Sequence, residues 1–130
     1  MKRVMIALAF VSLVACSGDM TGSSTVTGSY VLQNINGQAL PYTISGSGAN
    51  KTEVLDDEYT FHEGGTYSRT AHSRVTVGGV ASNTTLDDAG NYGLQATAVF
   101  LTSSRGNGDK VAQINGNTIT NALEGIKIKY

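Results

Sequence analysis

Apolar and polar residues alternate with a period of two along most of the chain after residue 25. In residues 66–77, for example, Tyr67, Ala71, Val75 and Val77 share one face. Such alternation is typical of β-strands with one buried face, and no window has apolar residues at helical spacing. The predicted strands cover residues 26–35, 38–45, 52–61, 66–77, 80–86, 91–102, 109–114, 117–121 and 123–130.

Short segments rich in Gly, Asn and Asp separate these strands. Asn36-Gly37 and Asn115-Gly116 predict tight hairpin turns, because both central residues of a type I′ turn need positive φ. The other predicted connections are residues 62–65, 78–79, 87–90 and 103–108. Pro41 indicates an edge or a bulge in its strand, since proline cannot donate to a ladder. The pattern therefore predicts an all-β fold, an antiparallel up-and-down meander of about eight strands that closes into a small β-barrel and so removes its edges.

The alternation also predicts which side chains point into the barrel. The expected inward-facing residues are Gly28, Tyr30, Leu32, Leu55, Tyr59, Phe61, Tyr67, Tyr92, Leu94, Ala96, Ala98, Phe100, Ile126, Ile128 and Tyr130, with Lys127 and Lys129 on the opposite face. An eight-stranded barrel has room for its own side chains or for one small ligand. The hydroxyls of Tyr30, Tyr59, Tyr67 and Tyr92 are candidates to line a ligand cavity, although such residues more often fill a small core.

The first sixteen residues have the order of a secretory signal. Lys2 and Arg3 precede an apolar run over residues 4–14 that is too short to span a membrane, and Leu-Val-Ala-Cys follows at 13–16. This ending resembles the lipobox of bacterial lipoproteins. The resemblance implies cleavage before Cys16, diacylglyceryl on its sulfur and an acyl chain such as palmitate on its amino group. The alternative is an ordinary signal with an incidental cysteine.

These features divide the chain into a lipoprotein signal peptide at 1–15, a lipidated flexible tether at 16–25 and a β-barrel domain at 26–130. Without the signal, seven basic residues face ten acidic ones, a net charge of −3 that argues against a nucleic-acid partner. Cys16 is the only cysteine, so the domain cannot form an internal disulfide. Trp is absent and Pro occurs once, while Gly is abundant, as suits strands and turns.

Several motifs, taken in order, resemble the small bacterial lipocalin-like lipoproteins. They are Gly28-Ser29-Tyr30, residues 35–41 (INGQALP), Gly64-Gly65-Thr66-Tyr67, Ala89-Gly90-Asn91-Tyr92 and residues 116–120 (GNTIT), and they span nearly the whole domain. The resemblance implies a non-catalytic barrel on the cell envelope, held to a membrane through Cys16. Ser17 after the cysteine is compatible, by resemblance to enterobacterial lipoproteins, with the outer membrane, facing the periplasm or the cell surface.

Arg69 is the most informative polar residue, because strict alternation from Tyr67 to Val75 places it on the apolar face. An unpaired guanidinium there would be costly. It could meet a ligand carboxylate inside the barrel. The preferred alternatives are that it lies near the barrel mouth, reaches out to water or is displaced by a bulge.

Other polar residues do not predict catalysis, a metal or a cofactor. The acidic stretch Glu53, Asp56, Asp57 and Glu58 could bind Ca²⁺, but a solvated edge that discourages aggregation is preferred. His62 and His72 are expected at the surface. Asp87 and Asp88 are expected to cap the amides of a turn. No serine lies in a nucleophile elbow, so an enzyme is not expected.

Two function classes follow from these observations. The first is a non-catalytic, lipid-tethered barrel that binds a small hydrophobic or amphipathic ligand. The alternative is an inhibitor-like interaction module or an envelope-structural module with a solid core. A membrane-spanning barrel is disfavoured, because the predicted outward faces are too polar for lipid.

Overall fold

The computed structural model describes residues 26–121 and 125–129, and all of its regular structure is β. The predicted signal peptide, Cys16, the predicted tether and Tyr130 lie outside the described residues. The strands are β1 (Gly28–Ile35), β2 (Gln38–Ala39), β3 (Tyr42–Ser47), β4 (Asn50–Phe61), β5 (Thr66–Val77), β6 (Val80–Gln95), β7 (Ala98–Ser103), β8 (Lys110–Asn115), β9 (Thr118–Asn121) and β10 (Gly125–Lys129). No helix in the described part has the length and apolar character needed to cross a membrane.

One antiparallel sheet contains all of these strands, in the order β2-β1-β10-β9-β8-β7-β6-β5-β4-β3. β1 also pairs with β4, from Gly28 opposite Phe61 to Val31 opposite Glu58. This pairing closes β1 and the strands from β4 through β10 into a ring. β2 and β3 lie outside the ring. The structure confirms the predicted all-β antiparallel meander that curls into a barrel.

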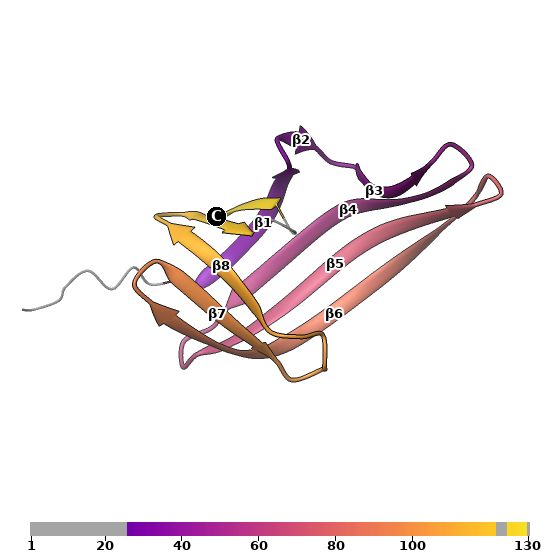
Figure 1. Ribbon diagram of the computed structural model, residues 1–130. Helices are drawn as coiled ribbons and strands as arrows, with labels where there is room; N and C mark the ends of the chain where they lie inside the picture. Colours follow the sequence, from indigo (N-terminus) through magenta and orange to yellow (C-terminus); the bar gives the residue numbers. More distant parts are fainter. Residues whose placement is uncertain (1–25, 122–124, 130) are drawn as a thin grey trace, which may run out of the picture.

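A sheet extension projects from one end of this barrel, at the right of Figure 1. We define the extension as β3, residues 50–55 of β4, residues 72–77 of β5 and residues 80–87 of β6. Its strands pair with one another, whereas β7 pairs with β6 only from Gly90 onward. The turn that joins β5 to β6, Gly78-Gly79, has positive φ at both glycines, as a tight hairpin needs.

The predicted turn at 87–90 is wrong. β6 continues straight through these residues, and each has a partner on β5, from Thr70 opposite Asp87 to Tyr67 opposite Gly90. Gly90 is required there because a Cβ would lie 2.0 Å from the carbonyl oxygen of Thr102 on β7. The chain turns instead after Gln95, where Ala96 adopts positive φ.

This displaced turn reverses the faces of the following strand. The predicted inward position of Phe100 is wrong, because its side chain is 41% exposed. Val99 and Leu101, its neighbours, are 0% and 3% exposed and belong to the core. A two-residue turn at 96–97 shifts the alternation by one residue, and a shift of one residue moves every side chain to the other face.

Two further strand predictions need correction. The segment 38–45 is not one strand, because β2 ends at Ala39 and pairs with β1, whereas β3 begins at Tyr42 and pairs with β4. The predicted outward position of Lys127 on β10 is also wrong: this side chain is 1% exposed. The second Asn-Gly hairpin is present, although its turn centres on Gly116 and Asn117 rather than on Asn115 and Gly116.

The core fills the end of the barrel opposite the extension. Phe61 lies at its centre, edge-on to Tyr30 and Tyr92, stacked with Tyr59 and tilted against Tyr67, at ring-centroid distances of 5.0–6.3 Å. The other core residues are Val26, Val99, Leu101, Ala112, Ile114 and Ile119. Inward side chains from facing strands thus close this end by packing.

Candidate functional site

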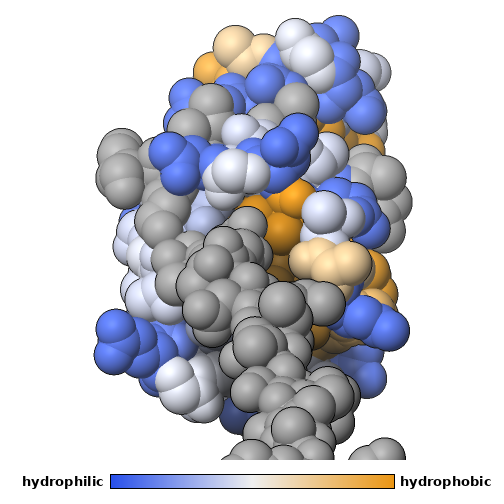
Figure 2. Space-filling model, turned by 90° about the vertical axis from the view of Figure 1, so that its left-hand side faces the viewer, coloured by the Kyte–Doolittle hydropathy of each residue, from blue (hydrophilic) through white to orange (hydrophobic). Residues whose placement is uncertain are grey.

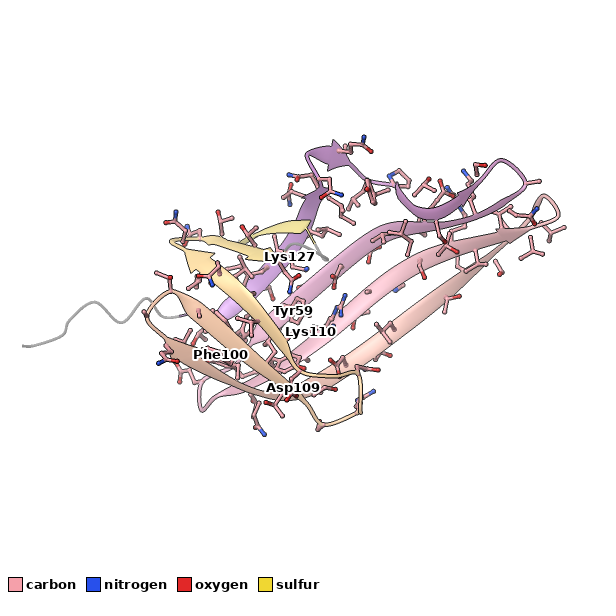
Figure 3. All side chains as sticks on the ribbon, in the orientation of Figure 1. Tyr59, Phe100, Asp109, Lys110 and Lys127 are labelled. Atoms are coloured by element: carbon pink, nitrogen blue, oxygen red, sulfur yellow. The ribbon has the colours of Figure 1, made fainter. Side chains whose placement is uncertain are left out.

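The barrel interior next to the extension is polar, in contrast to the aromatic core. Four charged side chains point into it: Asp57 from β4, Arg69 from β5, Asp88 from β6 and Lys127 from β10, each at most 9% exposed. Strand alternation places them there, because Asp57 has the parity of Tyr59 and Phe61 and Arg69 that of Tyr67. Figure 3 shows Lys127 close to Tyr59 in this region.

Asp57 binds both cations. Arg69 donates from Nε to Oδ1 and from Nη2 to Oδ2 of Asp57, each at 2.9 Å, which is the bidentate fork of a strong arginine–carboxylate pair. The Lys127 ammonium lies 3.1 Å from Oδ2 of the same carboxylate. Both cations also lie about 5 Å from the centre of the Tyr59 ring, within the range of cation–π attraction. Arg69 is thus paired and does not reach out to water, which was one of the three alternatives preferred from the sequence.

Asp88 forms a second buried network. Its carboxylate accepts hydrogen bonds from the Tyr67 hydroxyl at 3.0 Å, the Ser103 hydroxyl at 2.6 Å and the Ala89 amide at 2.9 Å. Burial raises the pKa of Asp88, but the donors, led by Ser103 and Asn107, outweigh burial and lower it. Burial and the bond to Asp88 raise the pKa of Tyr67 to about 12. Asp88 therefore caps an amide as expected, but within a strand instead of a turn.

An open pocket of about 190 Å³ lies over the charged cluster, between the barrel and the extension. Its walls are mainly apolar, and Asp57 and Arg69 lie among its lining residues. The lining residues are Leu32, Ile35, Ile44, Val54, Asp57, Arg69, Ala71, His72, Ser73 and Leu86. The register shifts at a bulge between Val54 and Asp56, and Val54 is therefore paired with Ser73 on β5. Paired residues share a face of the sheet, and both of these line the pocket.

Among the ligand candidates predicted from sequence, the structure brings only Arg69 to the pocket lining. Tyr59 contacts the charged cluster, and Tyr30, Tyr67 and Tyr92 pack in or against the core. Ligand contact by these tyrosines stays a prediction.

The burial of Asp57, Asp88 and Lys127 inside the barrel was not predicted from the sequence. The strict alternation of Asp57 with Tyr59 and Phe61 was a signal for the first of these. For Lys127 the stronger signal was misleading, because Ile126 and Ile128 flank it.

The solvated-edge interpretation of the acidic stretch is wrong for Glu53 and Asp57, which are buried and paired. Glu53 accepts hydrogen bonds from Arg74 and Lys51, each at 2.9 Å, and these lower its pKa. β4 is also not an edge strand. β3 and β1 pair along one of its sides, and β5 pairs along the other.

Neither histidine belongs to the buried charged cluster, although His72 is among the residues that line the pocket. His72 Nδ1 is 2.5 Å from Asp56 on the outer face, where both side chains are about half exposed, and His62 is exposed after β4. Within residues 26–121 and 125–129, no group of three His, Cys, Asp or Glu side chains could hold a metal ion.

No family model, curated protein or solved structure matches the chain.

Proposed function

We propose that the protein is a lipid-anchored envelope protein, similar to the small bacterial lipocalin-like lipoproteins, that binds a small amphipathic molecule without catalysis. The observation that carries this proposal is the open pocket with apolar walls over a buried ionic floor. Binding sites for small molecules commonly combine mostly apolar walls with a few placed polar groups.

The volume of the pocket limits its ligand. At about 190 Å³ it is smaller than the ~300–1,000 Å³ typical of sites for drug-sized molecules. It exceeds the ~150 Å³ of an engineered apolar cavity that takes up benzene. The ligand's buried part is therefore a short acyl chain or a single ring.

The polar residues of the pocket orient such a ligand. Apolar side chains such as Leu32, Ile44 and Leu86 would contact its hydrocarbon, and its polar group would reach the Asp57–Arg69 pair. The Asp57 carboxylate and the Arg69 guanidinium are held by each other, which suits binding rather than proton transfer. This arrangement supports a binding protein.

Pocket filling tests the proposal. Purified protein is titrated with medium-chain fatty acids, the matching alcohols and an environment-sensitive hydrophobic dye, and binding is followed by native mass spectrometry and amide NMR shifts. Ala71→Phe places a ring in the pocket and should weaken binding at least tenfold. Thr102→Phe, at an exposed position on β7 outside the pocket lining, is the matched control. Absence of adducts and shifts with wild-type protein would contradict ligand binding.

The anchor is tested separately, since it depends on Cys16. Cys16→Ser should release the protein from membranes and leave its folding intact, because the domain uses no disulfide. A variant that stays membrane-bound, or wild-type protein with no lipid at its N-terminus by mass spectrometry, contradicts this part of the proposal.

A second candidate function is a protein-interaction module. The packed aromatic end supports it, as do Phe100 and Val111, which pair across β7 and β8 and are both exposed. Figure 2 shows exposed hydrophobic surface among hydrophilic groups on the side of the molecule that it views. Crosslinking in cells that recovers a partner from wild type but not from Phe100→Ser would favour this function.

A further inference from the structure

The outer edge of β6 along the extension has an unusually regular backbone. In the described part of the chain, residues 80–87 pair only with β5, since β7 begins to pair at Gly90 (Figure 1). The β5–β6 register has no shift from Thr66 opposite Asn91 to Val77 opposite Val80. The extension's other edge, β3, has a bulge and a positive-φ glycine, Gly46, which both disfavour strand addition.

Backbone geometry identifies which groups point outward along this edge. The Tyr92 amide donates to the Gly65 carbonyl on the β5 side, and the Ser104 amide donates to the Ala89 carbonyl on the β7 side. Because hydrogen-bonding direction alternates along a strand, even-numbered residues of β6 face β5 and odd-numbered residues face away. The outward donors and acceptors are therefore those of Ala81, Asn83, Thr85 and Asp87.

Within the edge, Asp87 at one end is the only charged residue. Residues 80–86, VASNTTL, contain neither Lys nor Pro, the residues that usually protect sheet edges. Val80 and Leu86 are exposed at 75% and 42%, and both lie on the face that carries the pocket. An exposed edge of this kind, with a continuous register and no charge over residues 80–86, is a template for another strand.

We propose that the β6 edge pairs with the same edge of a second copy of this chain, forming a two-fold symmetric antiparallel dimer. In an antiparallel pair, two directly opposite residues have their side chains on the same face of the sheet. When the edge pairs with its own copy, opposite residues must therefore both have even residue numbers or both have odd ones. The register centred on Asn83 places Val80 opposite Leu86 of the partner subunit, and Leu86 opposite Val80 of the partner subunit. The segment is thus self-complementary in its two large apolar residues.

The same register provides hydrogen-bond partners for the outward backbone amides and carbonyls of the edge. Ala81 faces Thr85 of the partner subunit, and Asn83 faces Asn83 of the partner subunit, so all outward groups from 81 to 85 find partners in about six hydrogen bonds. Val80 then falls in a non-hydrogen-bonded pair, where side chains approach most closely. Since Leu86 lines the pocket, Val80 of the partner subunit would extend the pocket's apolar rim.

The interface is small, so we expect a weak dimer. One strand pair buries less than the ~1,200–2,000 Å² of a standard stable interface. A dissociation constant between about 10 µM and 1 mM is therefore expected.

Sedimentation equilibrium tests the dimer in the Cys16→Ser background, which removes the lipid and the only thiol. Asn83→Lys places two like charges at the symmetry axis and should weaken the dimer at least tenfold. Asn91→Lys is the matched control, because Asn91 is exposed on the same strand but paired with β7. Wild-type protein that stays monomeric at about 1 mM, or equal effects of both substitutions, overturns the proposal.

Cysteine crosslinking tests the register. Asn83→Cys should oxidise to a disulfide-linked dimer, because the two Cα atoms would be about 5.5 Å apart, within the disulfide range. Thr84→Cys should not, because its copies would lie about 8 Å apart. Crosslinking through Thr84→Cys but not Asn83→Cys would overturn the proposed register, and crosslinking through neither would overturn the edge pairing.

Discussion

At one end of the barrel interior, Phe61 packs among four tyrosines and a set of aliphatic residues. At the other end, Asp57 holds Arg69 and Lys127 beneath an open pocket. The same strands supply both ends, since β4 carries Asp57 as well as Phe61 and β5 carries Arg69 as well as Tyr67. On β5, only two positions separate Tyr67 in the aromatic core from Arg69 in the ionic cluster.

The difference shows what each end contributes. Burial of aromatic and aliphatic surface stabilises the fold at about 25 cal/mol per Å². Removing charges from water costs several kcal/mol per ion, which pairing only partly offsets. An apolar filling would serve stability at least as well, which is consistent with the ligand binding proposed above.

The largest expected effect is at the ionic end. Asp57→Ala leaves Arg69 and Lys127 buried without their shared carboxylate, and the free energy of unfolding should fall by about 3–5 kcal/mol in urea denaturation. Asp56→Ala is the control, because Asp56 is on the outer face and 54% exposed, and should change stability by about 0.5 kcal/mol or less.

A joint replacement sharpens this result. Asp57→Leu, Arg69→Met and Lys127→Met together remove all three charges, and the stability should return to within about 1 kcal/mol of wild type or exceed it. If the triple variant is as unstable as Asp57→Ala, the cost of Asp57→Ala does not come from uncompensated charge.

A somewhat smaller effect is expected at the apolar end. Leu101→Ala opens a cavity in the core and should lower the free energy of unfolding by about 3 kcal/mol. Phe100→Ala, one residue away, should cost less than about 1 kcal/mol, because the ring is 41% exposed. The reverse order in chemical denaturation would show that the chain turns at 87–90 instead of 96–97.

The smallest expected effect is at the boundary between the two ends. Tyr67→Phe removes a donor to Asp88 and should cost about 1.5–3 kcal/mol at neutral pH. Because the folded-state pKa of Tyr67 is raised from 10.0 to about 12, its contribution is present below pH 10.0 and lost as pH rises toward 12. The variant's unfolding free energy should therefore fall less than that of wild type over this range.

The stability contributed by Asp88 depends on pH with the opposite sign, and this dependence appears at acidic pH. The pKa of Asp88 is lowered, so its contribution is present above about pH 4 and lost as pH falls further. Asp88→Asn should reduce this acid loss, although Glu53, whose pKa is also lowered, maintains part of it. An acid profile identical to that of wild type would contradict the role assigned to the Asp88 network.

Much of the fold could be predicted from sequence alone, because strand alternation and glycine turns are local properties. The period-two pattern predicted the bounds of β5 correctly, and the Asn-Gly and Gly-Gly pairs marked three hairpins to within one residue. The same alternation placed Arg69 on the inner face. For the domain, local sequence thus determined the fold class and most strand positions.

Tertiary structure alone decided the features that need a partner from elsewhere in the chain. Asp88 and Gly90 have turn chemistry, yet pairing with β5 and β7 holds them in a strand, and this moved the turn to Ala96. Lys127 points inward because Asp57, seventy residues earlier, meets it across the barrel. A buried charge is stable only beside its counter-charge, and sequence alternation carries no record of which residues meet across a closed sheet.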